Sequence, residues 1–568
     1  MSWTESLGRL PGIATARGYR REWLRTDITA GFVLTALLIP AGMGYAEAAG
    51  LPAYAGLYAT IVPLLAYAVV GPSKILVLGP DSSLAPLIAA AVLPLAIVGD
   101  SENALALAGV LAILVGLILL IGGFLHLGFV TELLSKPIRL GYLNAIALVV
   151  VVGQLPKLLG FSVDASGLLD ELGEIGKSVA NGGIDPVAAA VGIGSLAVII
   201  AFRLWVPVVP GVLVAVVGAI ILSAAAGLTD QIGMVGALPE GLPLPSVGGV
   251  TWQDVGNLIG PAAGIALIAF ADTGVLSRTF AARHGEDVNG STEMKAIGVA
   301  NVAGGLFGGF PISASGSRTP VAEQSGAHTQ LAGVVGALAV LVFILVAPGL
   351  TAYLPDATLA AVVIVAASAL IDIGGMVRMW HMSTVEFGLA VAAFLGVALV
   401  GVLQGILVAI GLSLAAVIAQ VWQPHRTELV ETGDPLGFHD IQRHPNGRRI
   451  PGLVLVRFDA PLFFANGEIF DEYVRSVVDK APAPVEWVVI ASEPITGLDT
   501  TAVDELVDLD TFLEGRGIRL AFAELKGPIK DRLIKFGVGE RFDSTHFFPT
   551  VDAAVNAFKG RNDVPDDS

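Results

Sequence analysis

A succession of long apolar segments between Thr29 and Gln423 constrains the fold of this chain more than any other feature. Several of them are long enough to cross the roughly 30 Å hydrocarbon core of a bilayer as helices. Only 14% of the 568 residues are charged, whereas soluble domains carry roughly 25%. We therefore predict a polytopic α-helical membrane protein. The fourteen predicted spans cover residues 28–47, 53–70, 82–98, 105–125, 137–156, 185–203, 207–226, 255–276, 292–309, 315–328, 331–347, 355–372, 385–402 and 404–422.

The charges between these segments predict the orientation of the chain. Residues 1–27 hold five arginines and no apolar stretch, so we expect a retained cytoplasmic N-terminal segment without a cleaved signal peptide. With that end inside, the inner connections are basic and the outer ones mostly acidic, as the positive-inside rule requires. The inner basic residues are Lys74, Lys136, Arg139, Arg203, Arg278, Arg283, Lys295 and Arg378. We predict a multi-pass protein of the cell inner (plasma) membrane with both termini in the cytoplasm.

Two of the fourteen segments are too short and polar to be ordinary spans. Residues 78–84 (LGPDSSL) and 309–318 (GFPISASGSR) each follow two apolar helices and contain a proline, small hydroxyl residues and a helix start. Pro80 and Pro311 lie 231 residues apart, and Pro40 and Asp272 in the preceding helices lie 232 apart. This offset predicts an inverted repeat of seven plus seven spans, in which such interrupted segments mark the binding site of a transporter.

The composition changes beyond Pro424. Residues 424–450 are polar and are interpreted as a linker. Residues 451–560 alternate apolar runs at 453–458, 486–491 and 518–523 with amphipathic segments at 466–480, 502–516, 530–537 and 551–559, which predicts a compact α/β domain. Residues 561–568 are expected to be a disordered tail.

Residues 40–52 (PAGMGYAEAAGLP) and 56–59 (GLYA) resemble the signature of the sulfate permease (SulP) anion transporters, solute carrier family 26. The two polar segments fall in the family's order, and the C-terminal domain is similar to a STAS domain. The resemblance implies a core domain (spans 1–4 and 8–11) that moves against a gate domain (spans 5–7 and 12–14), with half-helices 3 and 10 meeting near mid-membrane. It also implies a homodimer and a cytoplasmic partner for the STAS domain.

The two half-helices are the predicted anion site. A buried anion needs compensating groups, and two facing helix N-termini offer backbone N–H groups and positive dipole ends. The candidate substrate-binding residues at these starts are Ser82, Ser83, Ser315, Gly316 and Ser317. The alternative is that the serines only cap the helices.

Arg318 is the strongest single candidate. An arginine within the membrane costs roughly 2.5–3.5 kcal/mol on insertion scales and normally faces a cavity or a partner. The Ser-Arg pair of the family matches Ser317-Arg318, where the resemblance implies that the arginine lends positive charge to the anion. The alternative is an Arg–Asp pair that only holds spans together.

Two carboxylates are candidate coupling-ion residues. Asp272 lies in an otherwise apolar span, and the resemblance implies that an acid here couples transport to H⁺ or Na⁺. Charge counting permits this role, because a bound sulfate dianion would leave an ionised Asp272 uncompensated without a co-bound cation. Asp81 is either a helix cap or a second coupling group.

Thr500 is the candidate regulatory residue. Residues 497–502 (GLDTTA) resemble the turn of STAS domains in which the first hydroxyl residue can be phosphorylated, and a simple turn that caps the following helix is the alternative.

Other function classes are disfavoured. Zero cysteines and eight scattered histidines give no metal-binding pattern, and we expect no resident cofactor and no enzymatic machinery. The net charge of −17 disfavours nucleic acid as a partner. We predict a secondary active transporter of a small oxyanion, with sulfate as the first choice and bicarbonate or a C4-dicarboxylate next. An uncoupled anion channel, a membrane-anchored sensor and, remotely, a nucleobase permease remain as alternatives.

Overall fold

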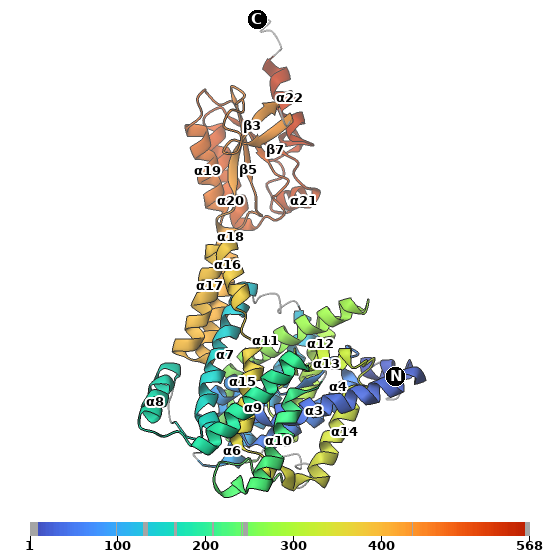
Figure 1. Cartoon of the computed structure of the whole chain (residues 1–568). Helices are drawn as coiled ribbons and strands as arrows, with labels where there is room; N and C mark the ends of the chain where they lie inside the picture. Colours follow the sequence, from blue (N-terminus) through green and yellow to red (C-terminus); the bar gives the residue numbers. More distant parts are fainter. Residues whose placement is uncertain are drawn as a thin grey trace, which may run out of the picture. The chain divides into compact units, whose positions relative to one another are not determined.

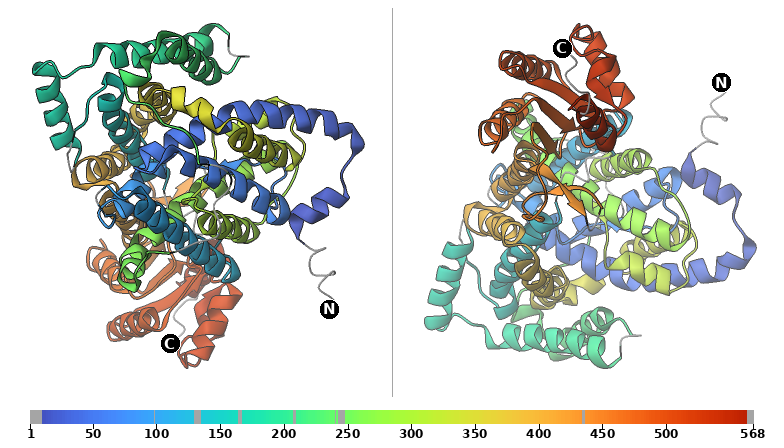
Figure 2. Two further views of the ribbon diagram at one scale, coloured as in Figure 1. Left: turned by 90° about the horizontal axis from the view of Figure 1, so that it is seen from below. Right: turned by 90° about the horizontal axis from the view of Figure 1, so that it is seen from above.

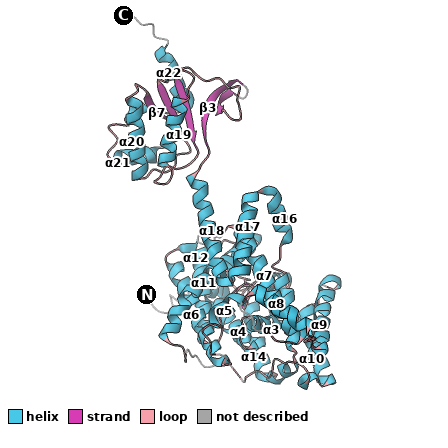
Figure 3. Cartoon of the chain, turned by 90° about the vertical axis from the view of Figure 1, so that its left-hand side faces the viewer, coloured by secondary structure: helices cyan, strands magenta, loops and turns pink. Residues whose placement is uncertain are grey.

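The structure is a computed structural model that describes residues 10–97, 99–128, 135–163, 167–206, 209–239, 241, 248–433 and 436–562 (Figure 1). The chain divides into two compact units, Met1–Ser413 and Leu414–Ser568. The first unit is helical, and the second combines helices with a sheet (Figure 3). The residues predicted as a disordered tail from 563 onward, and residues 1–9 of the predicted N-terminal segment, lie outside the described residues.

Each predicted span overlaps a helix of the structure. The helices are α3 (Leu24–Ala48), α4 (Ala53–Val70), α5 (Ala85–Val92), α6 (Ser101–Phe124), α7 (Lys136–Leu159), α9 (Pro186–Trp205), α10 (Gly211–Ala226), α11 (Trp252–Arg283), α12 (Gly290–Leu306), α13 (Arg318–Gln324), α14 (Leu331–Val346), α15 (Asp356–Ser368), α17 (Thr384–Leu395) and α18 (Val402–Trp422). Among the described residues, seven helices are long and apolar enough to cross a membrane. The number of spans therefore stays a prediction, because α5 and α13 have only 8 and 7 residues.

Three further helices were not predicted. They are α2 (Pro11–Arg17), α8 (Leu168–Ala180) and α16 (Ile373–Met382). They do not appear as long apolar segments in the sequence, because α2 and α16 are short and α8 carries two acidic residues in its first turn.

The helices of the first unit pack in two groups. The first group, which we call group A, contains α3, α4, α5, α6, α11, α12, α13 and α14; the second, group B, contains α7, α9, α10, α15 and α17. Within group A, α3 and α14 lie side by side (blue and olive in Figure 2). The crossing of α6 and α12 depends on glycine, because a Cβ atom at Gly305 would lie 2.5 Å from the carbonyl oxygen of Gly109. The glycine-rich run at 303–309 therefore serves close helix packing.

Two very short strands join the halves of group A. β1 (Leu78–Gly79) pairs antiparallel with β2 (Ser313–Ala314), with Leu78 opposite Ala314 and Gly79 opposite Ser313. The order α3, α4, β1, α5 is repeated as α11, α12, β2, α13. The two polar segments singled out in the sequence therefore meet, and a short helix leaves each of them.

The second unit contains a six-stranded sheet in the order β4-β3-β5-β6-β7-β8. Its elements are β3 (Arg426–Gly433), β4 (Leu436–Asp440), β5 (Leu453–Phe458), α19 (Gly467–Asp479), β6 (Trp487–Ala491), α20 (Thr500–Glu514), β7 (Arg519–Ala523), α21 (Gly527–Lys535), β8 (Phe547–Phe548) and α22 (Val551–Asn562). β5, β6, β7 and β8 run parallel, and β3 runs antiparallel to both neighbours. One face of the sheet packs against α19, α20 and α21 and the other against α22.

The predicted linker at 424–450 is wrong. Residues of this segment form β3 and β4, and β3 lies within the sheet between β4 and β5. The apolar pattern failed here because the buried positions of β3 include Thr427 and Thr432 beside Leu429 and Val430. In addition, α22 continues to Asn562, so the first two residues of the predicted tail are helical.

Candidate functional site

A cavity of about 670 Å³ lies between group A and group B. Group A and the segments around β1 and β2 contribute its polar lining, and group B contributes two arginines and apolar side chains. The polar lining from group A is Tyr45, Asp81, Ser82, Ser83, Asp272, Gly316, Ser317 and Arg318, and the two arginines from group B are Arg139 and Arg203. The predicted site residues of the membrane region, apart from Ser315, are thus brought together.

Ser315 does not line the cavity. The residue is 1% exposed, and its hydroxyl group accepts a hydrogen bond from the backbone N–H of Arg318 at 3.2 Å and lies 3.2 Å from the Ser317 hydroxyl. This residue therefore satisfies the start of α13, as the capping alternative predicted, while Gly316 and Ser317 remain open to the cavity.

Arg318 is buried, and only some of its N–H groups have hydrogen-bond partners. The residue is 2% exposed, and its Nη2 atom donates a hydrogen bond to the carbonyl oxygen of Pro80, which precedes α5. Its Nε and Nη1 atoms have no hydrogen-bond partner among the described residues. No Arg–Asp ion pair involves Arg318 in the part of the chain that the structure describes. A buried guanidinium with unpaired donors at a cavity wall can bind an anion.

Asp81 and Asp272 share one hydroxyl group. Ser83 Oγ lies 2.8 Å from Asp81 Oδ2 and 3.1 Å from Asp272 Oδ2, and the Ser83 backbone N–H donates to Asp81 Oδ2 at 3.0 Å. The serine hydroxyl carries one proton and can donate to only one carboxylate. The other contact needs a proton on the carboxyl group or a cation nearby. Asp81 is not the predicted cap of α5, because the N-cap position is Leu84 and no side chain caps this helix; Asp81 instead binds the Ser83 N–H and lines the cavity.

Sequence reasoning missed the cavity roles of Tyr45, Arg139 and Arg203. It assigned both arginines to inner connections, but they lie within α7 and α9 and line the cavity. The available signal was their position near a helix end, with Arg139 as the fourth residue of α7 and Arg203 two residues before the end of α9. With them, three arginines and two aspartates line the cavity, which leaves one net positive charge if both carboxylates are ionised.

Thr500 lies in the second unit and is not among the residues that line this cavity. It is the exposed first residue of α20, and Asp499 caps the helix by accepting a hydrogen bond from the Ala502 N–H at 2.9 Å. The capping turn is thus confirmed, and phosphorylation of Thr500 stays a prediction.

Comparison with known proteins decides the family. The Sulfate permease family matches residues 24–393, and the STAS domain matches residues 444–554. The Mycobacterium tuberculosis (strain ATCC 25618 / H37Rv) protein named "Probable sulfate transporter Rv1739c" is 40% identical over 557 residues, which cover 98% of this chain and 99% of that protein. The chain belongs to the sulfate permease family. The resemblance seen in the sequence is confirmed, and the chain is a multi-pass membrane protein of a transporter family, not of an enzyme family.

A more distant relative and two solved structures are also similar. The chloroplastic Sulfate transporter 4.1 of Arabidopsis thaliana is 29% identical over 591 residues, covering 98% of this chain and 83% of that protein. The solved murine Solute Carrier 26 family member A9 anion transporter has a TM-score of 0.91 at 22% identity and covers 99% of this chain and 95% of its own. The transmembrane domain of the cyanobacterial bicarbonate transporter BicA has a TM-score of 0.61 at 24% identity, covering 70% of this chain and 98% of its own. At these identities the two solved structures establish the fold alone.

Proposed function

We propose that this protein is a secondary active transporter that carries sulfate by alternating access. Relatives of high coverage are named as sulfate transporters, including the mycobacterial protein that is 40% identical. The single observation that carries the proposal is the buried guanidinium of Arg318, with two unpartnered nitrogen atoms among the described residues, at a cavity between two helix groups.

Group A is the proposed core domain and group B, with α18, the proposed gate domain. Group A contains both interrupted segments and the paired strands β1 and β2, so it holds most polar groups of the cavity. Movement of group B against it would open the cavity to one side of the membrane and then to the other. The proposal includes fourteen spans in a seven-plus-seven inverted repeat, cytoplasmic termini, a homodimer in the plasma membrane and a cytoplasmic partner at the STAS domain, regulated through Thr500.

Anion recognition rests on Arg318 and the groups beside it. Its free N–H groups would bind oxyanion oxygens, while the Ser317 hydroxyl and the Gly316 backbone lie exposed in the cavity at the start of α13. Ser82 and Ser83 add hydroxyl groups from the segment before α5. Arg139 and Arg203 supply further positive charge from group B.

Charge balance favours coupling to a cation through Asp272 and Asp81. The lining carries one net positive charge when both aspartates are ionised, so a bound sulfate dianion would leave one negative charge in a low-dielectric cavity. One H⁺ or Na⁺ at the pair bridged by Ser83 restores neutrality. A monoanion such as bicarbonate would balance without that cation.

The test is uptake of labelled sulfate into proteoliposomes with H⁺ and Na⁺ gradients imposed separately. Arg318→Ala should raise the KM for sulfate about 10- to 100-fold, because hydrogen bonds to charged groups contribute about 1.5–3 kcal/mol. Arg378→Ala, at an exposed position on α16, is the matched control and should leave uptake unchanged. Unchanged sulfate affinity in Arg318→Ala would contradict the proposal.

Asp272→Asn tests the coupling. It should retain sulfate binding and lose the dependence of uptake on the cation gradient, whereas Asp170→Asn on the exposed face of α8 should not. Gradient dependence that survives in Asp272→Asn would contradict the coupling role.

The same vesicles separate the alternatives. Bicarbonate or succinate transported faster than sulfate would indicate the related oxyanion functions, and uracil uptake would indicate a nucleobase permease. Conductance without saturation or counter-flow would indicate an uncoupled channel. Binding of a partner to the STAS domain without any transport would indicate a sensor.

A further inference from the structure

A second buried carboxylate lies outside the transport cavity and has no role in the mechanism above. Glu293, in the first turn of α12, is 0% exposed. The Tyr67 hydroxyl of α4 donates to its Oε1 atom at 2.5 Å, and the hydroxyl groups of Ser73 and Ser277 lie 2.7 Å from its Oε2 atom. No ion pair involves Glu293 within the described ranges. An ionised carboxylate at this position would be buried without a counter-charge, which is costly.

The number of hydroxyl protons shows which protonation state of Glu293 agrees with these contacts. Ser73 Oγ lies 2.8 Å from Ser277 Oγ, so these two oxygens and Glu293 Oε2 form a triangle with three contacts at hydrogen-bond distance. Each contact needs one proton, and the two serines supply two. The third proton must belong to the carboxyl group of Glu293. If the carboxylate were ionised, one pair of oxygens would touch with no proton between them.

The same geometry disfavours a metal ion. A cation would have to enter between oxygens that already touch one another at hydrogen-bond distance. Among the described residues, no group of three or more His, Cys, Asp or Glu side chains is placed to hold a metal. A proton is the ligand that fits this cluster.

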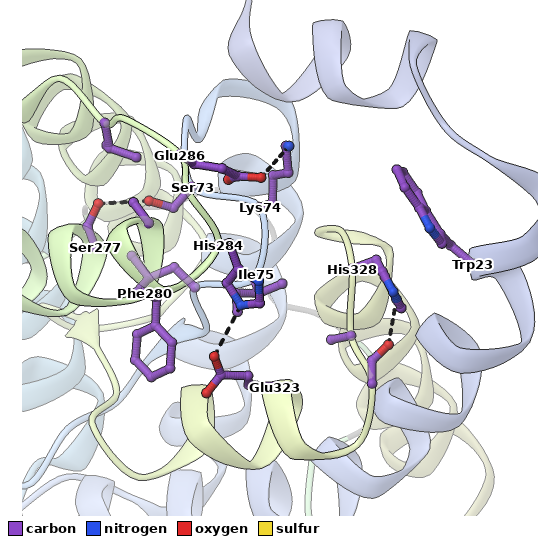
Figure 4. A pocket seen from close by; sticks show the side chains of 15 residues that line it. Trp23, Ser73, Lys74, Ile75, Ser277, Phe280, His284, Glu286, Glu323 and His328 are labelled. Carbon is purple, nitrogen blue, oxygen red and sulfur yellow. Dashed lines mark hydrogen bonds and ion pairs between the residues drawn. The ribbon is translucent and has the colours of Figure 1, made fainter.

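A separate small cavity gives the cluster a route to exchange protons. It has a volume of about 260 Å³, and Ser73 and Ser277 line it (Figure 4). Its wall also carries the ion pair of Lys74 with Glu286 and the contact of His284 Nε2 with Glu323 Oε1 at 3.1 Å. Glu293 itself is not among the lining residues, so the serine hydroxyls separate the carboxyl group from the cavity.

The other charged side chains on the helices around Glu293 contact other groups and not Glu293. α4 and α14 contain no charged residue, and α6 contains only Glu102. Lys295 of α12 lies over the ring of Phe124, and Asp27 of α3 accepts a hydrogen bond from the Thr329 hydroxyl.

Two further charged side chains lie at this end of α11. Arg278 donates a hydrogen bond to the Gly274 carbonyl, and Arg283 forms an ion pair with Glu323.

We propose that Glu293 is a second proton-binding site, protonated in this structure and in exchange with the small cavity through Ser73 and Ser277. Loss of the proton would remove one contact of the triangle and so weaken the attachment of α11 to the segment at 71–77. That segment leads directly into β1, and Gly79 of β1 packs against Arg318. The proton state of Glu293 is thus linked to the segment that positions the anion site.

Infrared spectroscopy of the full chain in lipid bilayers tests this site without measuring transport. At neutral pH the wild-type protein should show the C=O stretching band of a protonated, buried carboxylic acid. Glu293→Gln should remove the component of this band that Glu293 contributes, and Asp272→Asn should retain that component, which assigns it to Glu293 and not to the proposed coupling site. A band that is as strong in Glu293→Gln as in the wild-type protein, or that is missing from the wild-type protein, would overturn the proposal.

Tyr67→Phe provides a second variant that keeps the carboxyl group. Removal of the hydroxyl that donates to Oε1 should leave the band present and move it to higher wavenumber, because the C=O group loses its hydrogen bond. A band that does not move would overturn the assignment to Glu293, even if Glu293→Gln fails to fold. Neither result depends on sulfate being the transported anion.

Discussion

The guanidinium group of Arg318 packs directly against the backbone of Gly79. A Cβ atom at Gly79 would lie 3.1 Å from Nη1 and 3.4 Å from Nη2 of the arginine, and Gly79 has a φ of +148° that L residues rarely adopt. The glycine lies in β1, opposite Ser313 of β2. Gly79 belongs to the first set of repeated elements and Arg318 to the second. Because Gly79 has no side chain, the guanidinium group of Arg318 can be buried against its backbone.

Gly79→Ala should therefore displace the guanidinium group. We expect at least a tenfold rise in the KM for sulfate, equivalent to about 1.4 kcal/mol, because the displaced N–H groups no longer face the anion. Proteoliposome uptake measures it. Gly99→Ala is the control, since Gly99 also has a positive φ of +83° but an added methyl group there would meet nothing within 4 Å among the described residues. Equal effects of both variants would show that backbone strain alone is responsible.

Gly298→Leu should destabilise the crossing of α6 and α12. A Cβ atom there would lie 2.8 Å from the carbonyl oxygen of Gly116, so the two helices must separate. Overpacking typically costs about 1–3 kcal/mol, and we expect a lower thermal denaturation temperature of the full chain in detergent. Gly218→Leu on α10, where an added Cβ atom has no described neighbour within 4 Å, should denature like the wild-type protein. Similar temperatures for both variants would contradict this packing.

A C-terminal fragment that begins at residue 451 should be much less stable than one that begins at 424. The shorter fragment lacks β3 and β4, so it loses the burial of Leu429 and Val430 and exposes the edge of β5. Each such side chain contributes about 1.5–3 kcal/mol, a large share of the roughly 5–15 kcal/mol typical of a domain. Urea denaturation followed by circular dichroism compares the two. Equal midpoints would mean that β3 is dispensable.

The carboxyl group of Asp543 should titrate at unusually low pH. The side-chain hydrogen bond from Thr545, followed by bonds from His546 and the Thr545 N–H, lowers the pKa of Asp543 to about 2. The ionised form is favoured by folding, so its contribution to stability is present above the ordinary pKa of about 3.9 and is lost as the pH falls to about 2.

The measurement is a ¹³C NMR titration of the segmentally labelled full chain. Thr545→Ala should move the titration of Asp543 toward its ordinary pKa. Thr550→Ala, whose hydroxyl accepts from the Ala553 N–H instead, should leave it in place. A titration of Asp543 at its ordinary pKa in the wild-type protein would contradict the hydrogen bonds.

The elements that sequence predicted best are those whose burial follows an apolar pattern. The helices of the membrane region are long apolar segments, and β5, β6 and β7 bury apolar side chains in nearly continuous runs, so these elements lie where the sequence predicted them. β3 was missed because Thr427 is buried through its hydroxyl bond to Asp440 at 2.7 Å, which no pattern of apolar residues can reveal.

The site was predicted in part for a similar reason. Arg318 could be selected because an arginine is expensive in the membrane wherever it points. The bridge from Ser83 to Asp272 joins residues 189 positions apart and becomes visible only when the fold is known. The cavity positions of Arg139 and Arg203 were not predicted because a residue near a helix end can point to either a connection or a cavity, and sequence does not fix that direction.

The pairing of β1 with β2 has a mechanical consequence for the transporter. Because Leu78–Gly79 pairs with Ser313–Ala314, the two segments that carry most of the polar cavity lining are held together, and in the proposed mechanism they move as one unit. In the proposed mechanism, substitutions of the apolar cavity residues of group B should change the rate of transport, while the polar groups around β1 and β2 that bind the anion keep their arrangement.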